Sequence, residues 1–329
     1  MVLLTVGAMY GVNMVAEPFL DYDSDVQIRY YQIGRYILLA QGTPSNWGAG
    51  GAPTDLGLAS EGDNYELDID KISRLNPLND YSVNYTALWE SLDVEDVSFR
   101  ISVETLFDVS LNLEDTQVQG EQTLYNFSVT VMREGRPLVA DVSYYVAVRD
   151  TTQLSSGTTD GDGAGTVQFT LPNSKNGSSV LIALVDFEGL VSYGALSFAH
   201  NSGAPEPAGT YAVLSPMNHT LTVDLTSGAN VINAATFSRN YAFNLTADGS
   251  DYLIPRLLDP SPMISVVTGS NASDYWVEWV AYPQVPLETG ADMSADYVVS
   301  DVSSASYIVS VKGASYRFII EFRSPEEHD

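Results

Sequence analysis

MVLLTVGAMYGVNMVA, residues 1–16, carries no charged side chain. An acidic stretch, EPFLDYDSD, follows it at residues 17–25. A single membrane-spanning helix needs about 20 apolar residues, so this segment is short for that role. A secretory signal peptide has basic residues ahead of its apolar run, whereas the first arginine here is Arg29. Neither a membrane-spanning helix nor a signal peptide therefore explains this segment fully, although its side chains need an apolar environment.

A helical pattern continues beyond Pro18. Apolar side chains recur with the spacing of one helix face, at Val26, Tyr30, Ile33, Ile37 and Ala40. Gly42, Thr43 and Pro44 then provide an end signal, because glycine suits a helix C-terminus and proline cannot continue the helix. Together, residues 1–41 predict a helix about 60 Å long, bent near Pro18, apolar all round at first and then on one face.

Three environments suit this predicted helix. It can be buried in its own globular domain, act as a permanent membrane anchor, or lie in a bundle of identical helices from neighbouring subunits. The bundle is favoured because Gly7 and Gly11 permit close backbone approach and Tyr10 and Asn13 suit a packed interface. The residues expected in this assembly core are Val2, Leu3, Leu4, Val6, Gly7, Met9, Tyr10, Gly11, Val12, Met14, Val15, Phe19 and Leu20.

This order of features resembles archaeal type IV pilin-like surface and filament proteins, which carry a class III signal peptide. The resemblance covers about the first 105 residues. It includes the apolar segment, DVQIRYYQIGRYILL at 25–39, GTPSNWG at 42–48, LGLA at 56–59 and YELDIDKISRL at 65–75. It implies assembly on the cell envelope, with N-terminal helices in the filament core. Thr5 stands where bacterial type IV pilins usually have a glutamate, so charge pairing between adjacent N-termini is not implied.

The overall composition excludes several classes of function. The formal net charge is −28, and nucleic-acid binding needs a basic face that this chain lacks. The chain has no cysteine and three histidines, which excludes thiol catalysis and disfavours a His-based zinc site. Motifs for serine hydrolases, zinc proteases and phosphate-binding loops are absent from the sequence. We therefore expect no enzyme activity and no cofactor.

The rest of the chain predicts β-structure. Short alternating runs separated by Gly, Asn and Asp turns predict an immunoglobulin-like sandwich, and a second β-rich unit follows the linker HNSGAPEPAG at 200–209. The expected fold is mainly β with a long N-terminal α-helix, a pilin-like helix carrying two β-sandwich (Ig-like) head domains. The expected parts are an assembly helix at 1–45, a connecting α/β region at 46–120, the Ig-like sandwich at 121–204 and an outer β-rich domain at 205–329.

Some surface features predict modification or binding. Six Asn-x-Ser/Thr sequons predict glycosylation, at Asn84, Asn126, Asn176, Asn218, Asn244 and Asn271. Asp160 and Asp162 alternate with glycines and are weak calcium candidates, although a hairpin turn explains them better. Aromatic residues at 275–282 suit a glycan-binding strip or, more often, core packing.

These observations predict an extracellular structural subunit on an archaeal cell surface, with adhesion as its role. Its partners are then identical subunits, a membrane transiently before assembly, and surface glycans, but no nucleic acid. The alternatives are a single-copy membrane-anchored surface protein and a secreted glycan-binding module.

Overall fold

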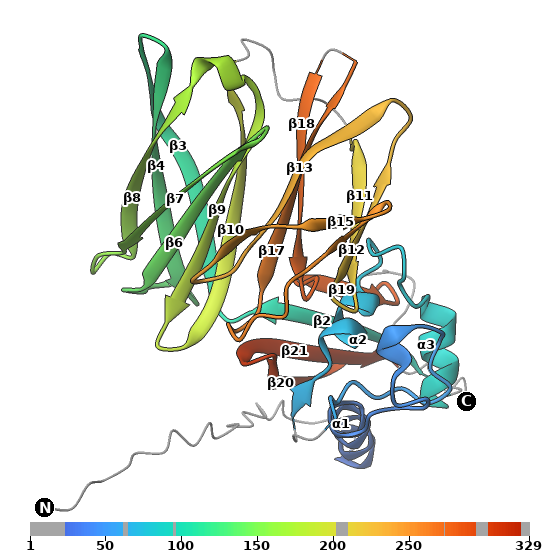
Figure 1. Ribbon diagram of the computed structural model, residues 1–329. Helices are drawn as coiled ribbons and strands as arrows, with labels where there is room; N and C mark the ends of the chain where they lie inside the picture. The colour runs from blue at the N-terminus through green and yellow to red at the C-terminus, as the bar shows by residue number, and fades with distance from the viewer. Residues whose placement is uncertain are drawn as a thin grey trace, which may run out of the picture.

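The computed structural model describes residues 24–61, 65–94, 97–201, 210–272, 274–293 and 302–323. Two β-sandwiches stand side by side on a third unit, the base, which contains the helices (Figure 1). Strands dominate the described residues, in which three α-helices occur.

The base is built from both ends of the described chain. Its five-stranded sheet has the order β1-β20-β21-β2-β19, and β2 pairs with β21 from Ser98 opposite Arg323 to Thr105 opposite Tyr316. Burial alternates along β21, so its apolar side chains face the base core. The elements are α1 (Ser24–Leu39), η1 (Trp47–Ala49), β1 (Glu66–Leu67), α2 (Ile69–Leu75), α3 (Tyr85–Leu92), β2 (Ser98–Thr105), β19 (Leu287–Gly290), β20 (Ser303–Val311) and β21 (Ala314–Arg323).

The first sandwich follows β2 directly. One of its sheets pairs β4 with β3, β5 and β8, and the other has the order β10-β9-β6-β7. Alternate side chains of β4 are buried between the two sheets. The elements are β3 (Asp108–Gln119), β4 (Gln122–Arg133), β5 (Arg136–Pro137), β6 (Asp141–Val148), β7 (Thr151–Thr158), β8 (Ala164–Pro172), η2 (Asn173–Lys175), β9 (Gly177–Phe187) and β10 (Leu190–His200).

The second sandwich pairs the sheets β11-β12-β16-β15 and β14-β13-β17-β18 around Trp276 and Tyr282. Its chain then returns to the base through β19. The elements are β11 (Ala212–Met217), β12 (Thr220–Leu225), β13 (Ala229–Phe237), β14 (Ala242–Asn244), β15 (Thr246–Asp248), β16 (Asp251–Leu253), β17 (Met263–Asn271) and β18 (Asp274–Tyr282).

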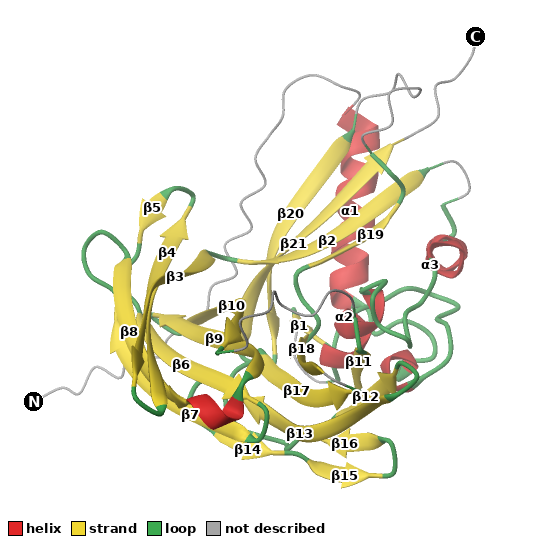
Figure 2. Cartoon of the chain, turned by 90° about the horizontal axis from the view of Figure 1, so that it is seen from above, coloured by secondary structure: helices red, strands yellow, loops and turns green. Residues whose placement is uncertain are grey.

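The two sandwiches share an apolar contact, so four sheets are stacked in layers. Tyr145 of β6 and Phe237 of β13 stack with their ring centroids 4.7 Å apart, in a cluster that also contains residues of β9, β17 and β18. Strand β9 lies inside this stack and is buried on both faces, which explains its continuous apolar run. The layers are visible from above in Figure 2.

The predicted long N-terminal helix is wrong. The described helix α1 has 16 residues, Ser24–Leu39, and it packs on the base of its own subunit. The periodic stripe after Pro18 identified this helix correctly, but residues 1–16 have no helical period, and extending the helix through them rested on composition alone. The chain turns away at Gly42, where a Cβ would lie 2.5 Å from the Asp55 carbonyl oxygen, so only glycine fits.

The β-sandwich part of the predicted fold agrees in part with the structure. Most of the alternating runs that predict strands coincide with strands. The strands that were not predicted are β1, β5, β7, β10, β13, β15, β16 and β19, and the helix α3 was not predicted either. Residues 120 and 121, at the predicted start of the sandwich, form the turn of the β3–β4 hairpin. Residues 296–301 of a strand predicted at 296–302, and most of the linker at 200–209, lie outside the described residues.

Candidate functional site

Helix α1 is fixed firmly to the base. Tyr30 stacks on Phe322 at 4.6 Å between ring centroids, and the Tyr307 hydroxyl donates a 3.1 Å hydrogen bond to the Tyr31 carbonyl oxygen. Gly34 lets the helix approach the sheet, because a Cβ there would lie 2.8 Å from the Tyr307 hydroxyl oxygen. Ile37 is completely buried. The helix therefore forms one rigid body with the sheet.

The opposite face of α1 is exposed and partly apolar. Ile28 and Tyr36 are 52% and 48% exposed, and Gln32 lies between them at a spacing of four residues. Beside this stripe is a groove of about 340 Å³, lined by Arg29, Gln32, Ile33, Tyr36, Asp55 and Leu92. The Tyr36 hydroxyl donates a 2.7 Å hydrogen bond to Asp55, which raises the pKa of Tyr36. We did not predict this stripe from the sequence, although the four-residue spacing of Ile28, Gln32 and Tyr36 indicates one helix face.

The predicted assembly residues, from Val2 to Leu20, lie outside the described residues. The structure therefore neither brings them together nor separates them. What it does place is α1, whose first residue, Ser24, comes four positions after Leu20. The uncharged segment thus joins the body at a helix that is fixed on one side and exposed on the other.

Buried hydrogen bonds from Trp47 and Lys71 hold the loop that follows α1. Trp47 is fully buried, and its indole donates a 2.8 Å hydrogen bond to the Gly57 carbonyl. The Lys71 ammonium donates to the carbonyls of Gln41 and Ala59, both at 2.9 Å. Burial lowers the pKa of Lys71, opposed by the nearby carboxylate of Asp68. Because the carbonyls of Gln41 and Ala59 belong to separate segments, Lys71 connects these segments. The sequence did not reveal this structural role.

The base meets the second sandwich at a polar contact around Asp70 of α2. Asp70 accepts 2.7 Å hydrogen bonds from the Tyr282 hydroxyl and from the Asn218 amide. Burial raises the pKa of Asp70, while these two donors oppose the rise. His219 packs edge-on against Tyr282, and burial together with Arg256 and Lys312 lowers its pKa to about 4. These residues therefore connect the base to the second sandwich.

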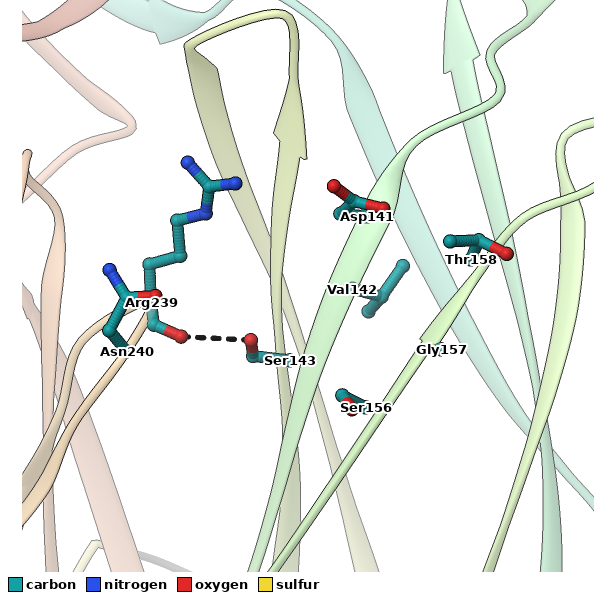
Figure 3. A pocket seen from close by; sticks show the side chains of 8 residues that line it. All are labelled: Asp141, Val142, Ser143, Ser156, Gly157, Thr158, Arg239 and Asn240. Atoms are coloured by element: carbon teal, nitrogen blue, oxygen red, sulfur yellow. Dashed lines mark hydrogen bonds between the residues drawn. The ribbon is translucent and has the colours of Figure 1, made fainter.

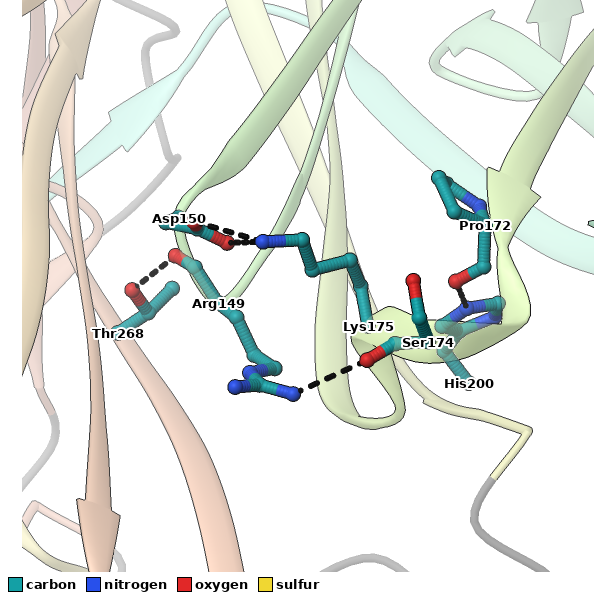
Figure 4. Close-up of polar contacts among 7 residues, drawn as sticks. All are labelled: Arg149, Asp150, Pro172, Ser174, Lys175, His200 and Thr268. Carbon is teal, nitrogen blue, oxygen red and sulfur yellow. Dashed lines mark hydrogen bonds and ion pairs between the residues drawn. The ribbon is translucent and has the colours of Figure 1, made fainter.

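A second polar contact joins the two sandwiches near β7 and β17 (Figure 4). The Arg149 guanidinium lies 3.9 Å from the Tyr275 ring and donates a 3.2 Å hydrogen bond to the Ser174 carbonyl. Lys175 pairs with Asp150 at 2.6 Å. Close to them, His200 lies 2.9 Å from the Pro172 carbonyl, and burial lowers its pKa. Burial therefore disfavours the charged form of His200 in this structural contact.

A shallow polar hollow of about 380 Å³ lies between β6, β7 and the turn after β13 (Figure 3). Ser143 donates a 2.8 Å hydrogen bond to the Arg239 carbonyl at its wall. The Arg239 guanidinium is already paired at 2.8 Å with the buried Asp186. The hollow therefore offers few free groups to a ligand, and the sequence did not predict it.

The structure places the six predicted glycosylation sites in different surroundings. Asn84, Asn176, Asn218 and Asn244 are exposed, whereas Asn126 and Asn271 are partly buried within β4 and β17. The Asn84 side chain also accepts a 2.9 Å hydrogen bond from the Ala87 amide and caps α3. The Asn126 side-chain oxygen is buried and has no hydrogen-bond partner among the described residues. Modification at all six sites stays a prediction.

The weak calcium candidates lie in the turn between β7 and β8. Asp160 accepts hydrogen bonds from the amides of Asp162 and Ala164 at 2.9 and 3.0 Å, so this carboxylate stabilises the turn. Across the described part of the chain, no three His, Asp or Glu side chains come together as a metal ion needs.

The aromatic residues of β18 do not form one continuous strip. Trp276 and Tyr282 are buried in the sandwich core, while Trp279 is 36% exposed and packs edge-on against Tyr193. Tyr275 lies under the Arg149 guanidinium. Glycan binding by these residues stays a prediction.

Comparisons with known proteins identify no family. No family model matches the chain, and no curated protein matches it. Among solved structures, a red sea bream transglutaminase is similar over 54% of this chain and 31% of its own, with 13% identity and a TM-score of 0.21. The human GIVD cytosolic phospholipase A2, solved with methyl gamma-linolenyl fluorophosphonate, is similar over 70% and 33%, with 10% identity and a TM-score of 0.16. The chain spans about a third of the length of each.

No helix within the described ranges combines the length and apolarity that a membrane crossing demands.

Proposed function

We propose that this chain is a structural subunit that associates with its own copies into an extracellular filament on an archaeal cell surface. Residues 1–16 provide the contact between copies, and the acidic β-units form the outer surface, which carries glycans and adheres to other surfaces. A transient membrane association precedes assembly. The resemblance of the first 105 residues to archaeal type IV pilin-like proteins supports this proposal.

The observation that carries the proposal is the connection between the uncharged segment and the body. Sixteen uncharged residues lead through a short acidic stretch into α1, and α1 is fixed to the base sheet through Tyr30 and Ile37. Burial of one large apolar side chain contributes about 1.5–3 kcal/mol, so the segment gains strongly from leaving water. Because the connecting helix is fixed to the base, association of the segments would also position the bodies.

The exposed stripe of α1 supports the same role. Ile28 and Tyr36 lie on the helix into which the uncharged segment leads, and they are half exposed in the single subunit. Exposed apolar side chains that lie together favour contact with another protein surface. A neighbouring subunit in a polymer would cover this stripe.

The test is deletion of residues 1–16, with electron microscopy and sedimentation of the product. We expect the full chain to form filaments and the shortened chain to form none, with an unchanged unfolding curve. Deletion of residues 324–329 at the other end is the matched control, and filaments should persist in it. Filaments from the shortened chain, or detergent-extractable monomers of the full chain without filaments, would refute the proposal.

A further inference from the structure

The outer side of the first sandwich contains two uncharged edge strands. β7 and β8 each pair with one strand only, β6 and β4 respectively. Neither Thr151–Thr158 nor Ala164–Pro172 contains Asp, Glu, Lys or Arg, in a chain with 17% charged residues. Some other edge strands carry carboxylates, such as Asp115 on β3 and Asp248 on β15, whereas the edge strands β10, β11 and β14 also lack charged side chains. Charged side chains commonly protect edge strands from pairing with another chain, and this side lacks them.

Strand β7 also exposes an apolar side chain at its centre. Leu154 is 66% exposed, and the residues from Ser156 to Thr158 are exposed as well. Gln153 on the other face is held by a 2.9 Å hydrogen bond from its amide to the Thr170 carbonyl, which connects β7 to β8. The strand is therefore ordered by the sandwich while its outer edge offers backbone donors and acceptors.

The charges at the two ends of β7 are of opposite sign. At the end where β7 begins lie Arg149, Asp150 and Lys175, which pairs with Asp150, and together they have one net positive charge. At the end where β7 stops lie Asp160 and Asp162. In antiparallel pairing of two copies, the acidic turn of each strand lies beside the basic end of the other. Parallel pairing would instead place like charges together.

From this arrangement we propose that β7 pairs antiparallel with β7 of a second copy across a twofold axis, with Leu154 opposite Leu154. Each sheet β10-β9-β6-β7 then continues into the sheet of its partner. Residues that face each other in an antiparallel pair lie on the same side of the sheet, so the central residue of a twofold pair faces its own copy. Centring the pair on Leu154 covers the exposed leucine. This contact is independent of residues 1–16, and it would connect filaments or single subunits side by side.

The absence of cysteine allows a direct test by disulfide formation. Leu154→Cys in the full chain should give a disulfide-linked dimer on mild oxidation, at a yield at least tenfold above that of Val118→Cys. Val118 is the matched control because it is 70% exposed on the edge strand β3. Equal yields from the two variants would overturn the proposal.

The antiparallel orientation has its own test in the Leu154→Cys background. Asp162→Lys removes the attraction between the acidic turn of one copy and the basic end of β7 in the other, so it should reduce the dimer yield severalfold. Asp248→Lys makes the same charge change on β15 and should leave the yield unchanged. If Asp162→Lys has no effect, the antiparallel orientation is refuted. Unfolding curves of all variants establish that each is folded.

Discussion

Two tyrosine–aspartate hydrogen bonds in this protein have equal length and different surroundings. The Tyr282 hydroxyl donates to the half-buried Asp70 at 2.7 Å, in the contact between the base and the second sandwich. The Tyr36 hydroxyl donates to Asp55 at 2.7 Å beside the exposed face of α1. A carboxylate that loses a donor in a buried site keeps its desolvation cost, whereas an exposed one gains water instead. The two bonds therefore contribute differently to stability.

We predict that Tyr282→Phe lowers the free energy of unfolding by about 1–3 kcal/mol, because Asp70 loses a donor in the contact between the base and the second sandwich. Tyr36→Phe should change it by less than about 0.5 kcal/mol. Urea unfolding of both variants and the parent measures the difference. Equal effects of the two substitutions would show that the Asp70 contact does not hold the units together.

His219 predicts a pH dependence of stability. Its pKa of about 4 in the folded chain lies below its ordinary value of 6.5, so protonation favours the unfolded chain. The contribution of the neutral His219 ring to the free energy of unfolding is complete above pH 6.5, and it is lost as the pH falls toward 4. This pKa difference corresponds to about 3 kcal/mol, and the partial exposure of the ring reduces the expected loss to about 1–2 kcal/mol.

The measurement is urea unfolding of the parent and of His219→Asn between about pH 7 and pH 4.5. Carboxylates titrate in both proteins, so the difference between them isolates His219. Asn suits the positive φ of 57° at this position. If both proteins lose stability equally over this pH range, the histidine is not responsible.

At the scale of elements, Gly34 determines how closely α1 approaches the base sheet. Its position has no space for a side chain beside Tyr307 and Ile320. We predict that Gly34→Leu lowers the free energy of unfolding by about 1–3 kcal/mol through overpacking and increases hydrogen exchange in α1. Arg35→Leu on the exposed face of the helix is the control, with an expected change within about 0.5 kcal/mol. An unchanged exchange pattern in Gly34→Leu would contradict the tight packing of α1.

The sequence predicted elements where periodicity was clear. The stripe after Pro18 identified α1, and the end signal at Gly42 to Pro44 identified where the helix stops. The missed strands are less regular: β7 is polar except for Leu154, and β13 contains small residues and a bulge near Ile232. The exposed stripe of α1 was missed because Ile28 and Tyr36 lie outside the buried stripe. Periodicity indicates the face that packs on the core, and it does not tell whether the opposite face meets solvent or a partner.

At the scale of the whole molecule, the pairing of β2 with β21 was beyond sequence reasoning. Strands about 220 residues apart meet in one sheet, as in the pair Arg100 and Glu321. No local pattern records such a partner, and linear order suggested successive units instead. The contact between the sandwiches was equally hidden, because no local pattern around Tyr145 or Phe237 indicates a partner in another unit.

The central claim is that residues 1–16 hold copies together against the mutual repulsion of their acidic bodies. The most direct measurement is sedimentation velocity of the full chain at about 0.05 M and about 1 M sodium chloride, where the screening length falls from more than 10 Å to about 3 Å. With a net charge of −28 on each copy, we predict larger assemblies at high salt for the full chain and nothing larger than a dimer for the chain lacking residues 1–16. Assemblies of equal size in both chains, or assemblies that dissolve at high salt, would contradict the claim.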